Sequence, residues 1–173
     1  MGEVAVKLIQ PRVGADPDAA ARFEREVKTL TGLTHPYVVR VFDYGVTEDG
    51  ILYYAMELLD GADLAALVEE EGPIEPERAV RLVRQAAEAL AEAHAAGVVH
   101  RDVKPQNLLL VTSDVSREFV KLIDFGIAKT GFGDEQLTAT GMIIGTPGYI
   151  APEVITGQPA TPAADIYALG GVL

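Results

Sequence analysis

The spacing of apolar residues divides the first 58 residues of the chain into four short elements. Residues 4–9 are rich in β-branched side chains, which predicts a strand. Residues 20–33 carry apolar side chains at the 3.6-residue period of a helix. Two further strand-like runs, residues 37–44 and 51–58, are separated by the hairpin-turn signal Asp49-Gly50. The pattern therefore predicts strand, helix, strand, strand.

Helical spacing becomes dominant after this β-rich part of the chain. Asp63 is expected to cap a short helix that runs to residue 70. Residues 75–96 repeat apolar side chains with a helical period, and Pro76 and Gly97 stand where a helix favours them, in its first turn and after its end. These signals predict a long amphipathic helix that buries one face.

The rest of the chain predicts short strands, a long loop and an unfinished helix. The apolar runs at residues 108–111 and 119–123 are typical of strands. Residues 130–150 form a Gly/Thr-rich loop, and such length in a compact domain favours a functional role. Residues 163–173 begin an apolar helix.

The change of character at residues 57–61 predicts an α+β chain of two units. The first unit is expected at residues 1–56, the connector at 57–61 and the helix-rich unit at 62–173.

Composition narrows the function classes without choosing one. The 173 residues carry a formal net charge of −12, which argues against general affinity for nucleic acid or anionic membranes. The sequence has no cysteine, which excludes disulfides, Cys-ligated zinc and a thiol nucleophile. It has neither a membrane-length apolar run nor a secretion signal. We therefore expect a cytoplasmic location for this part of the protein.

The strongest chemical signal is the block of residues 100–107, His-Arg-Asp-Val-Lys-Pro-Gln-Asn. Asp102, Lys104 and Asn107 combine a carboxylate, a cation and an amide oxygen in one loop. Asp124 follows an apolar strand and opens Asp-Phe-Gly, which adds a second carboxylate at a strand end. Phosphoryl transfer needs such a set, to orient a hydroxyl, hold a migrating phosphate and ligate Mg²⁺.

These motifs resemble those of eukaryotic-type (Hanks-type) serine/threonine protein kinases, in their bacterial form. The resemblance implies a bilobal α+β fold, with an N-lobe at residues 1–56, a hinge at 57–61 and a C-lobe at 62–173. It implies ATP with Mg²⁺ or Mn²⁺ as cofactors. The family pattern extends past both ends of the chain, so we expect a fragment with impaired activity.

Within this family, Val4-Ala5-Val6-Lys7 resembles the strand whose lysine holds the α- and β-phosphates of ATP. Glu26 is similar to the helical acid that pairs with that lysine. Glu24 is a competing acid on the same helix, and Glu26 is favoured because it stands four residues before Leu30 on the apolar side.

The second strand-like run resembles the last N-lobe strand and the hinge. The resemblance places Met56 at the back of the ATP pocket. It also implies that the backbone of Glu57 and Leu59 hydrogen-bonds the edge of the adenine ring. Ala5 and Leu109 would then enclose the adenine ring. Asp63 has two open interpretations, a ribose contact and a helix cap.

Residues 145–153, from Gly-Thr-Pro-Gly to Ala-Pro-Glu, resemble the segment that seats a protein substrate. Thr146 would contact the catalytic Asp102 and Lys104, as in Ser/Thr-specific members. Thr138 and Thr140 resemble activation-loop threonines that bacterial members autophosphorylate, and Arg101 would pair with the phosphate.

Two histidines and one aspartate are expected to have structural roles. His35 and His94 are interpreted as satisfying local hydrogen bonds. Asp165 resembles the buried acid that anchors the catalytic loop.

The resemblance implies transfer of the ATP γ-phosphoryl group to Ser or Thr hydroxyls of proteins, with self-association for phosphorylation in trans and no nucleic-acid partner. One alternative is a catalytically silent, ATP-binding or scaffold module with this fold. A second is a small-molecule phosphotransferase, against which the segment 145–153 argues.

Overall fold

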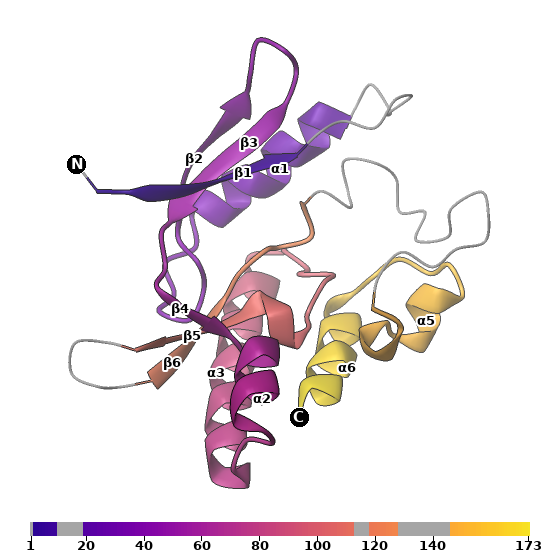
Figure 1. Cartoon of the computed structure of the whole chain (residues 1–173). Coiled ribbons are helices and arrows are strands. Elements are labelled where there is room, and N and C mark those ends of the chain that lie inside the picture. The colour runs from indigo at the N-terminus through magenta and orange to yellow at the C-terminus, as the bar shows by residue number, and fades with distance from the viewer. Residues whose placement is uncertain (1, 10–18, 113–117, 128–145) are drawn as a thin grey trace.

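The computed structural model describes residues 2–9, 19–112, 118–127 and 146–173 (Figure 1). Its elements are, in order, β1 (Val4–Ile9), α1 (Ala19–Thr31), β2 (Val41–Val46), β3 (Leu52–Glu57), β4 (Gly61–Asp63), α2 (Leu64–Glu71), α3 (Pro76–Ala95), β5 (Leu108–Thr112), β6 (Glu118–Leu122), α5 (Pro152–Ile155) and α6 (Pro162–Val172). Short 3₁₀ turns occupy Pro105–Asn107 and Pro147–Tyr149. The predicted α+β class is confirmed.

The N-terminal part is a three-stranded antiparallel sheet in the order β1-β3-β2, with α1 beside it (Figure 1). α1 buries Phe23, Val27 and Leu30, which recur at helical spacing and are at most 2% exposed. Gly50 adopts a φ of 78° in the turn between β2 and β3, a conformation that glycine permits at little cost. The predicted strand at residues 4–9, the helix and the hairpin are therefore confirmed, but the first hairpin strand begins at Val41 and not at residue 37.

The C-terminal part is built around α3, which buries one stripe of small and branched residues. The predicted cap is confirmed, because Asp63 Oδ1 accepts hydrogen bonds of 3.0 Å from the amides of Ala65 and Ala66. A second three-stranded sheet, β4-β5-β6, lies against this helical part. β4 was not predicted, since three residues are too few to show a period. Gly61 is required in β4, because a Cβ there would collide with the Leu110 carbonyl.

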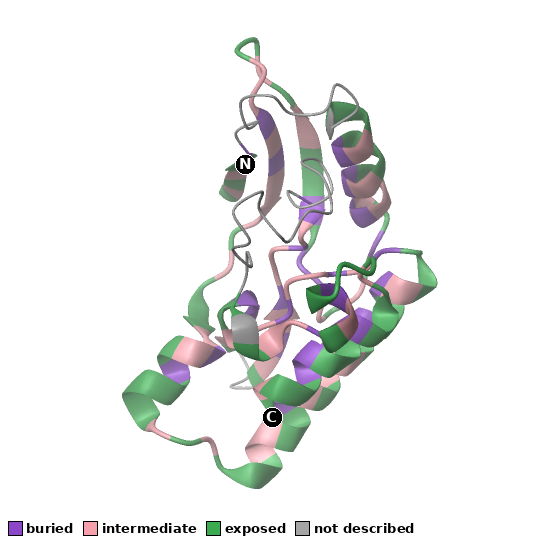
Figure 2. Ribbon diagram, turned by 90° about the vertical axis from the view of Figure 1, so that its right-hand side faces the viewer, coloured by how far each residue is buried: buried purple, intermediate pink, exposed green. Residues whose placement is uncertain are grey.

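One hydrophobic cluster joins the two sheets and runs into α3 and α6 (Figure 2). It includes Tyr54 from β3, Leu64 from α2 and Phe125, which follows β6. A small second cluster, Ala151, Val154 and Ala164, ties α5 to α6. In the short connector between β3 and β4, Leu59 packs against this cluster. No helix in the described ranges is long and apolar enough to cross a membrane.

Candidate active site

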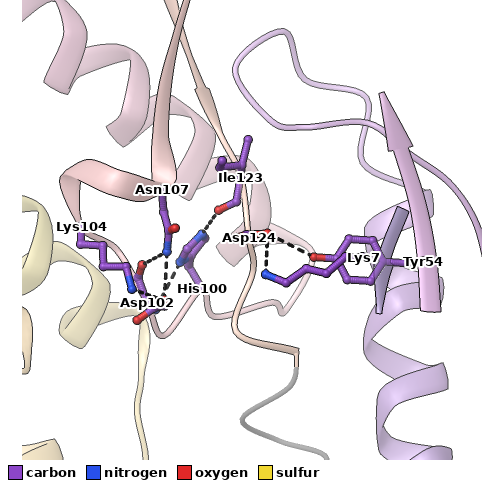
Figure 3. Close-up of polar contacts among 8 residues, drawn as sticks. All are labelled: Lys7, Tyr54, His100, Asp102, Lys104, Asn107, Ile123 and Asp124. Carbon is purple, nitrogen blue, oxygen red and sulfur yellow. Dashed lines mark hydrogen bonds and ion pairs between the residues drawn. The ribbon is translucent and has the colours of Figure 1, made fainter. Parts of the chain in front are cut away.

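The loop between α3 and β5 gathers Asp102, Lys104 and Asn107 (Figure 3). Lys104 Nζ lies 3.0 Å from Asp102 Oδ2. Asn107 Nδ2 donates to the same oxygen at 3.0 Å and to the Asp102 backbone carbonyl at 2.7 Å. The Asp102 and Lys104 side chains are 22% and 24% exposed, so a ligand could reach them. The three residue types expected for phosphoryl transfer are therefore in contact.

A buried carboxylate on α6 holds the backbone of this loop. Asp165 is 1% exposed and accepts hydrogen bonds from the amides of His100 at 2.7 Å and Arg101 at 2.8 Å. Arg101 has a φ of 65°, which costs free energy in a side chain larger than glycine. The two hydrogen bonds stabilise this strained residue next to Asp102. His94 Nε2 also lies 2.8 Å from Asp165, so its contact is structural, but the partner lies 71 residues away and is not the local one that was predicted.

His100 supports the loop from beneath as a neutral imidazole. Its Nε2 lies 2.9 Å from the Ile123 carbonyl, and its Nδ1 accepts from the Asp102 amide at 3.2 Å. These contacts require the proton on Nε2. Burial lowers the pKa of His100, although the nearby carboxylates oppose this shift. The ring also packs against Phe125, with centroids 4.6 Å apart.

Asp124 stands two residues after the end of β6, where its carboxylate meets the N-terminal sheet (Figure 3). Its Oδ1 lies 2.7 Å from Lys7 Nζ on β1 and 3.5 Å from the Tyr54 hydroxyl on β3. Burial and the charge of Asp124 raise the pKa of Tyr54, which therefore stays protonated and can donate. The site thus draws residues from both sheets.

The predicted pairing of Lys7 with Glu26 is not the one that the structure shows. Lys7 pairs with Asp124, while Glu26 Oε1 lies 3.3 Å from Arg101 Nη1. Sequence spacing places each acid on its own element, but it cannot rank the carboxylates that a long lysine side chain reaches. The structure therefore does not form the predicted Lys7–Glu26 ion pair.

Asn107 and Asp124 were predicted to hold a magnesium ion, and both side chains carry the oxygen donors that such an ion takes. Both contacts of the Asn107 amide use Nδ2, so its carbonyl oxygen Oδ1 is the atom that suits a hard cation. No group of three or more His, Cys, Asp or Glu side chains in the described ranges could hold a metal alone. Two oxygen donors match Mg²⁺, which takes its other ligands from water and phosphates.

The residues predicted to bind adenine lie around the connector. Ala5 pairs with Met56 across β1 and β3, and Leu59 and Leu109 are half-buried. The Glu57 amide already donates to the Arg40 carbonyl at 2.9 Å. An adenine contact from Glu57 would therefore use its carbonyl oxygen.

Thr146 lines a cavity together with Arg101, Asp102 and Lys104. The cavity volume is about 30 Å³, which suits about two water molecules and is too small for most side chains. Thr146 is therefore placed near the predicted catalytic pair. The predicted phosphorylation sites Thr138 and Thr140 lie outside the described residues.

Comparison with known proteins agrees with this geometry. The protein kinase domain family matches residues 2–173. The chain belongs to this family. It is 48% identical over 170 residues to the serine/threonine-protein kinase PknE of Mycobacterium bovis and to PknD of Mycobacterium tuberculosis. It is 41% identical over 173 residues to the serine/threonine-protein kinase pkn3 of Myxococcus xanthus.

These alignments cover 98% of the chain in each case, but they span only 29%, 25% and 32% of the three kinases. Among solved structures, the PknI kinase domain of Mycobacterium tuberculosis matches with a TM-score of 0.75 and 32% identity. That alignment covers 97% of this chain and 60% of the PknI chain. The chain is thus part of a bacterial-type Ser/Thr protein kinase domain, and the predicted family and fold are confirmed.

Two residues at the site of this kinase domain, Tyr54 and Lys121, were not predicted from the sequence. Tyr54 is 2% exposed, and a buried tyrosine hydroxyl usually has a hydrogen-bond partner, but this burial is visible only in the folded chain. Lys121 lies on β6 and pairs with Glu57 at 2.6 Å. Nothing in the local pattern of β6 indicated that partner, which is 64 residues earlier in the chain.

Proposed function

We propose that this kinase domain transfers the γ-phosphoryl group of ATP to Ser or Thr hydroxyls of proteins. The observation that carries the proposal is the Asp102 carboxylate, held between Lys104 and Asn107 on a loop anchored by buried Asp165. Phosphoryl transfer depends mainly on positioning and electrostatics, and a preorganised loop supports both.

In this proposal Asp102 orients the substrate hydroxyl and accepts its proton. Lys104, which already contacts Asp102, neutralises charge on the γ-phosphate. Asn107 and Asp124 hold Mg²⁺, which when bound lowers the negative charge on the phosphates. Thr146, on the wall of the same cavity, supports Asp102 and Lys104.

Lys7 holds the α- and β-phosphates of ATP in the same scheme. To do so, Lys7 must give up its 2.7 Å contact with Asp124 and contact the phosphates instead. Asp124 Oδ1 would then be free to hold the metal. Glu26 supports Lys7 in the loaded site, which requires Glu26 to leave Arg101. Both pairs are part-exposed, so these exchanges cost little free energy.

Adenine is proposed to lie between Ala5 and Leu109, with Met56 behind it. The Glu57 carbonyl and the Leu59 backbone bind the adenine edge. The half-burial of these residues beside the connector supports this assignment.

Autophosphorylation at Thr138 and Thr140 is proposed as well, with a second copy of the chain as a transient partner. Arg101 would pair with the phosphothreonine. Its side chain is 20% exposed, so a phosphate could reach it. We propose a cytoplasmic location for the domain as well, because the proposed reaction uses ATP as a substrate.

A catalytically silent nucleotide-binding module is the second candidate. The Lys7–Asp124 ion pair favours it, because this pair engages two residues that ATP and Mg²⁺ require. Turnover then depends on whether nucleotide binding separates the pair.

Phosphosite mapping by mass spectrometry after incubation with Mg²⁺ and ATP tests the proposal. The chain and a version extended to a full kinase domain are compared with Asp102→Asn. Asp60→Asn is the matched control, since it removes an exposed connector carboxylate. Phosphate on Thr138 or Thr140 in the extended domain and in Asp60→Asn, but absent from Asp102→Asn, is expected. ATP binding without any phosphorylation would favour the silent module.

A further inference from the structure

A segment of four residues lies between α1 and β2 (Figure 1). Its backbone is hydrogen-bonded to both sheets. At one end the Leu122 amide on β6 donates to the Tyr37 carbonyl at 2.8 Å, and the Val39 amide donates to the Leu122 carbonyl at 3.0 Å. At the other end the Glu57 amide on β3 donates to the Arg40 carbonyl at 2.9 Å. We call residues 37–40 the strap, because their backbone joins β6 to the start of the connector.

One lysine closes this strap with its side chain. Lys121 on β6 is 12% exposed, and its Nζ donates to Glu57 Oε1 at 2.6 Å and to the Val38 carbonyl at 3.2 Å. The same Glu57 oxygen accepts the Arg40 amide at 2.8 Å. Lys121 therefore holds the first residue of the connector and the strap together. Charge-assisted hydrogen bonds of this length are the stronger kind.

The position of Lys121 on β6 gives this contact a consequence for ligand binding. Lys121 lies three residues before Asp124, whose carboxylate faces the phosphate end of the proposed nucleotide site. Glu57 belongs to the connector at the proposed adenine end. The Lys121–Glu57 pair therefore joins the two ends of one ligand site through a strand and a single ion pair.

We propose that Lys121 is a positioning residue for nucleotide binding, which holds the connector backbone at a set distance and orientation from Asp124. The inference rests on the proposed ATP site. Lys121 touches the Glu57 side chain and the strap, so it acts through the backbone that it orients.

The test compares Lys121→Met with a matched variant in the same chain. Arg78 forms a similar cluster with two carboxylates, at 2.6 Å from Glu118 and 3.1 Å from Glu71, but on α3 and away from the connector. Arg78→Met therefore removes a comparable ion-pair cluster without touching the nucleotide site. Mg·ATP affinity is measured by calorimetry at a temperature where circular dichroism shows each variant folded.

Lys121→Met is expected to bind Mg·ATP about five- to tenfold more weakly, as is typical of coupling between sites. Arg78→Met is expected to stay within about twofold of the unsubstituted chain. Lys121→Arg retains the charge and is expected to recover most of the affinity. Equal affinity in Lys121→Met and the unsubstituted chain, or an equal loss in Arg78→Met, overturns the inference.

Hydrogen exchange separates this inference from the proposed function. Without nucleotide, the connector amides at residues 58–60 are expected to exchange faster in Lys121→Met than in Arg78→Met. If the unsubstituted chain binds no Mg·ATP, the proposed function fails and this exchange comparison alone decides the positioning role. Equal exchange rates of these amides in the two variants reject the positioning role of Lys121. If Lys121→Met does not fold, Glu57→Gln is compared with Glu118→Gln by Mg·ATP affinity and by amide exchange. Equal affinity or equal exchange in these two variants then overturns the inference.

Discussion

The catalytic loop and the N-terminal side of the site are held together by different kinds of interaction. Around the loop, His100, Asn107 and Asp165 are at most 5% exposed, and their polar atoms are bonded to backbone groups. On the N-terminal side, Lys7 and Asp124 form an ion pair between side chains that are 36% and 31% exposed. Buried hydrogen bonds resist exchange, whereas part-exposed ion pairs change partners at little cost.

This difference suits a phosphoryl-transfer site. The residues that act on the reacting hydroxyl need one preorganised geometry, so a rigid loop supports them. The residues that receive a charged ligand must release their present partners when the ligand arrives. The comparison therefore predicts large stability effects around the loop and small ones on the N-terminal side.

The largest expected effect comes from Asp165→Ala. Removal of the buried carboxylate leaves the His100 and Arg101 amides without their acceptor, and we expect a loss of about 3–5 kcal/mol in the free energy of unfolding. Urea unfolding measures this loss.

Asp63→Ala is the matched control for this variant. Asp63 also accepts two backbone amides, but at the exposed start of a helix, so its loss should cost about 1 kcal/mol. Equal losses in the two variants would contradict the assignment of a special role to the buried anchor.

The second effect concerns pH and His100. Because burial lowers its folded pKa below the ordinary value of 6.5, the unfolded chain takes up a proton first as pH falls. Stability is therefore full above about pH 6.5 and declines below it, by about 1.4 kcal/mol for each unit that separates the two pKa values. Urea midpoints measured from about pH 7.5 down to about pH 5.5, on either side of the ordinary pKa of histidine, follow this decline.

His100→Gln should flatten the decline, since glutamine does not titrate in this range. His35→Gln, which removes a histidine at the turn before the strap, should leave it in place. A decline that persists unchanged in His100→Gln would show that other groups cause it.

A smaller effect is expected for Lys7→Met. The ion pair with Asp124 is about one third exposed, so its loss should change the free energy of unfolding by less than about 1 kcal/mol. Mg·ATP affinity should nevertheless fall, because the phosphates lose their cation. Calorimetry and urea unfolding are measured together, with exposed Lys28→Met as the control. A stability loss as large as that of Asp165→Ala would mean that the two regions do not differ.

The smallest effect is expected for Tyr54→Phe. The hydroxyl lies 3.5 Å from Asp124, which is long for a hydrogen bond, and Asp124 keeps Lys7 when the hydroxyl is removed. We expect a change below about 0.5 kcal/mol in thermal unfolding. Tyr53→Phe on the opposite face of β3 is the control. A loss above about 1 kcal/mol confined to Tyr54→Phe, on the order of a full buried hydrogen bond, would place this hydroxyl among the rigid contacts.

Local patterns predicted most of the elements. The helix expected at residues 75–96 is observed as Pro76–Ala95, and the strand at 4–9 is observed as Val4–Ile9. The strand expected at 37–44 begins only at Val41, because Tyr37 and Val39 bond to Leu122 on β6, and within residues 37–40 only Arg40 bonds to β3. That partner strand lies about 80 residues later in the chain, so periodicity near residue 37 could not reveal it.

The sequence by itself determined most of the helices and strands, the family and the identity of the chemical groups, because these depend on local periodicity and on short motifs. Tertiary structure alone decided which charges meet: Lys7 with Asp124, Glu26 with Arg101 and Lys121 with Glu57. The physical reason is that a charged side chain can pair with any opposite charge within its reach. Only the packing of distant elements determines which charges come that close.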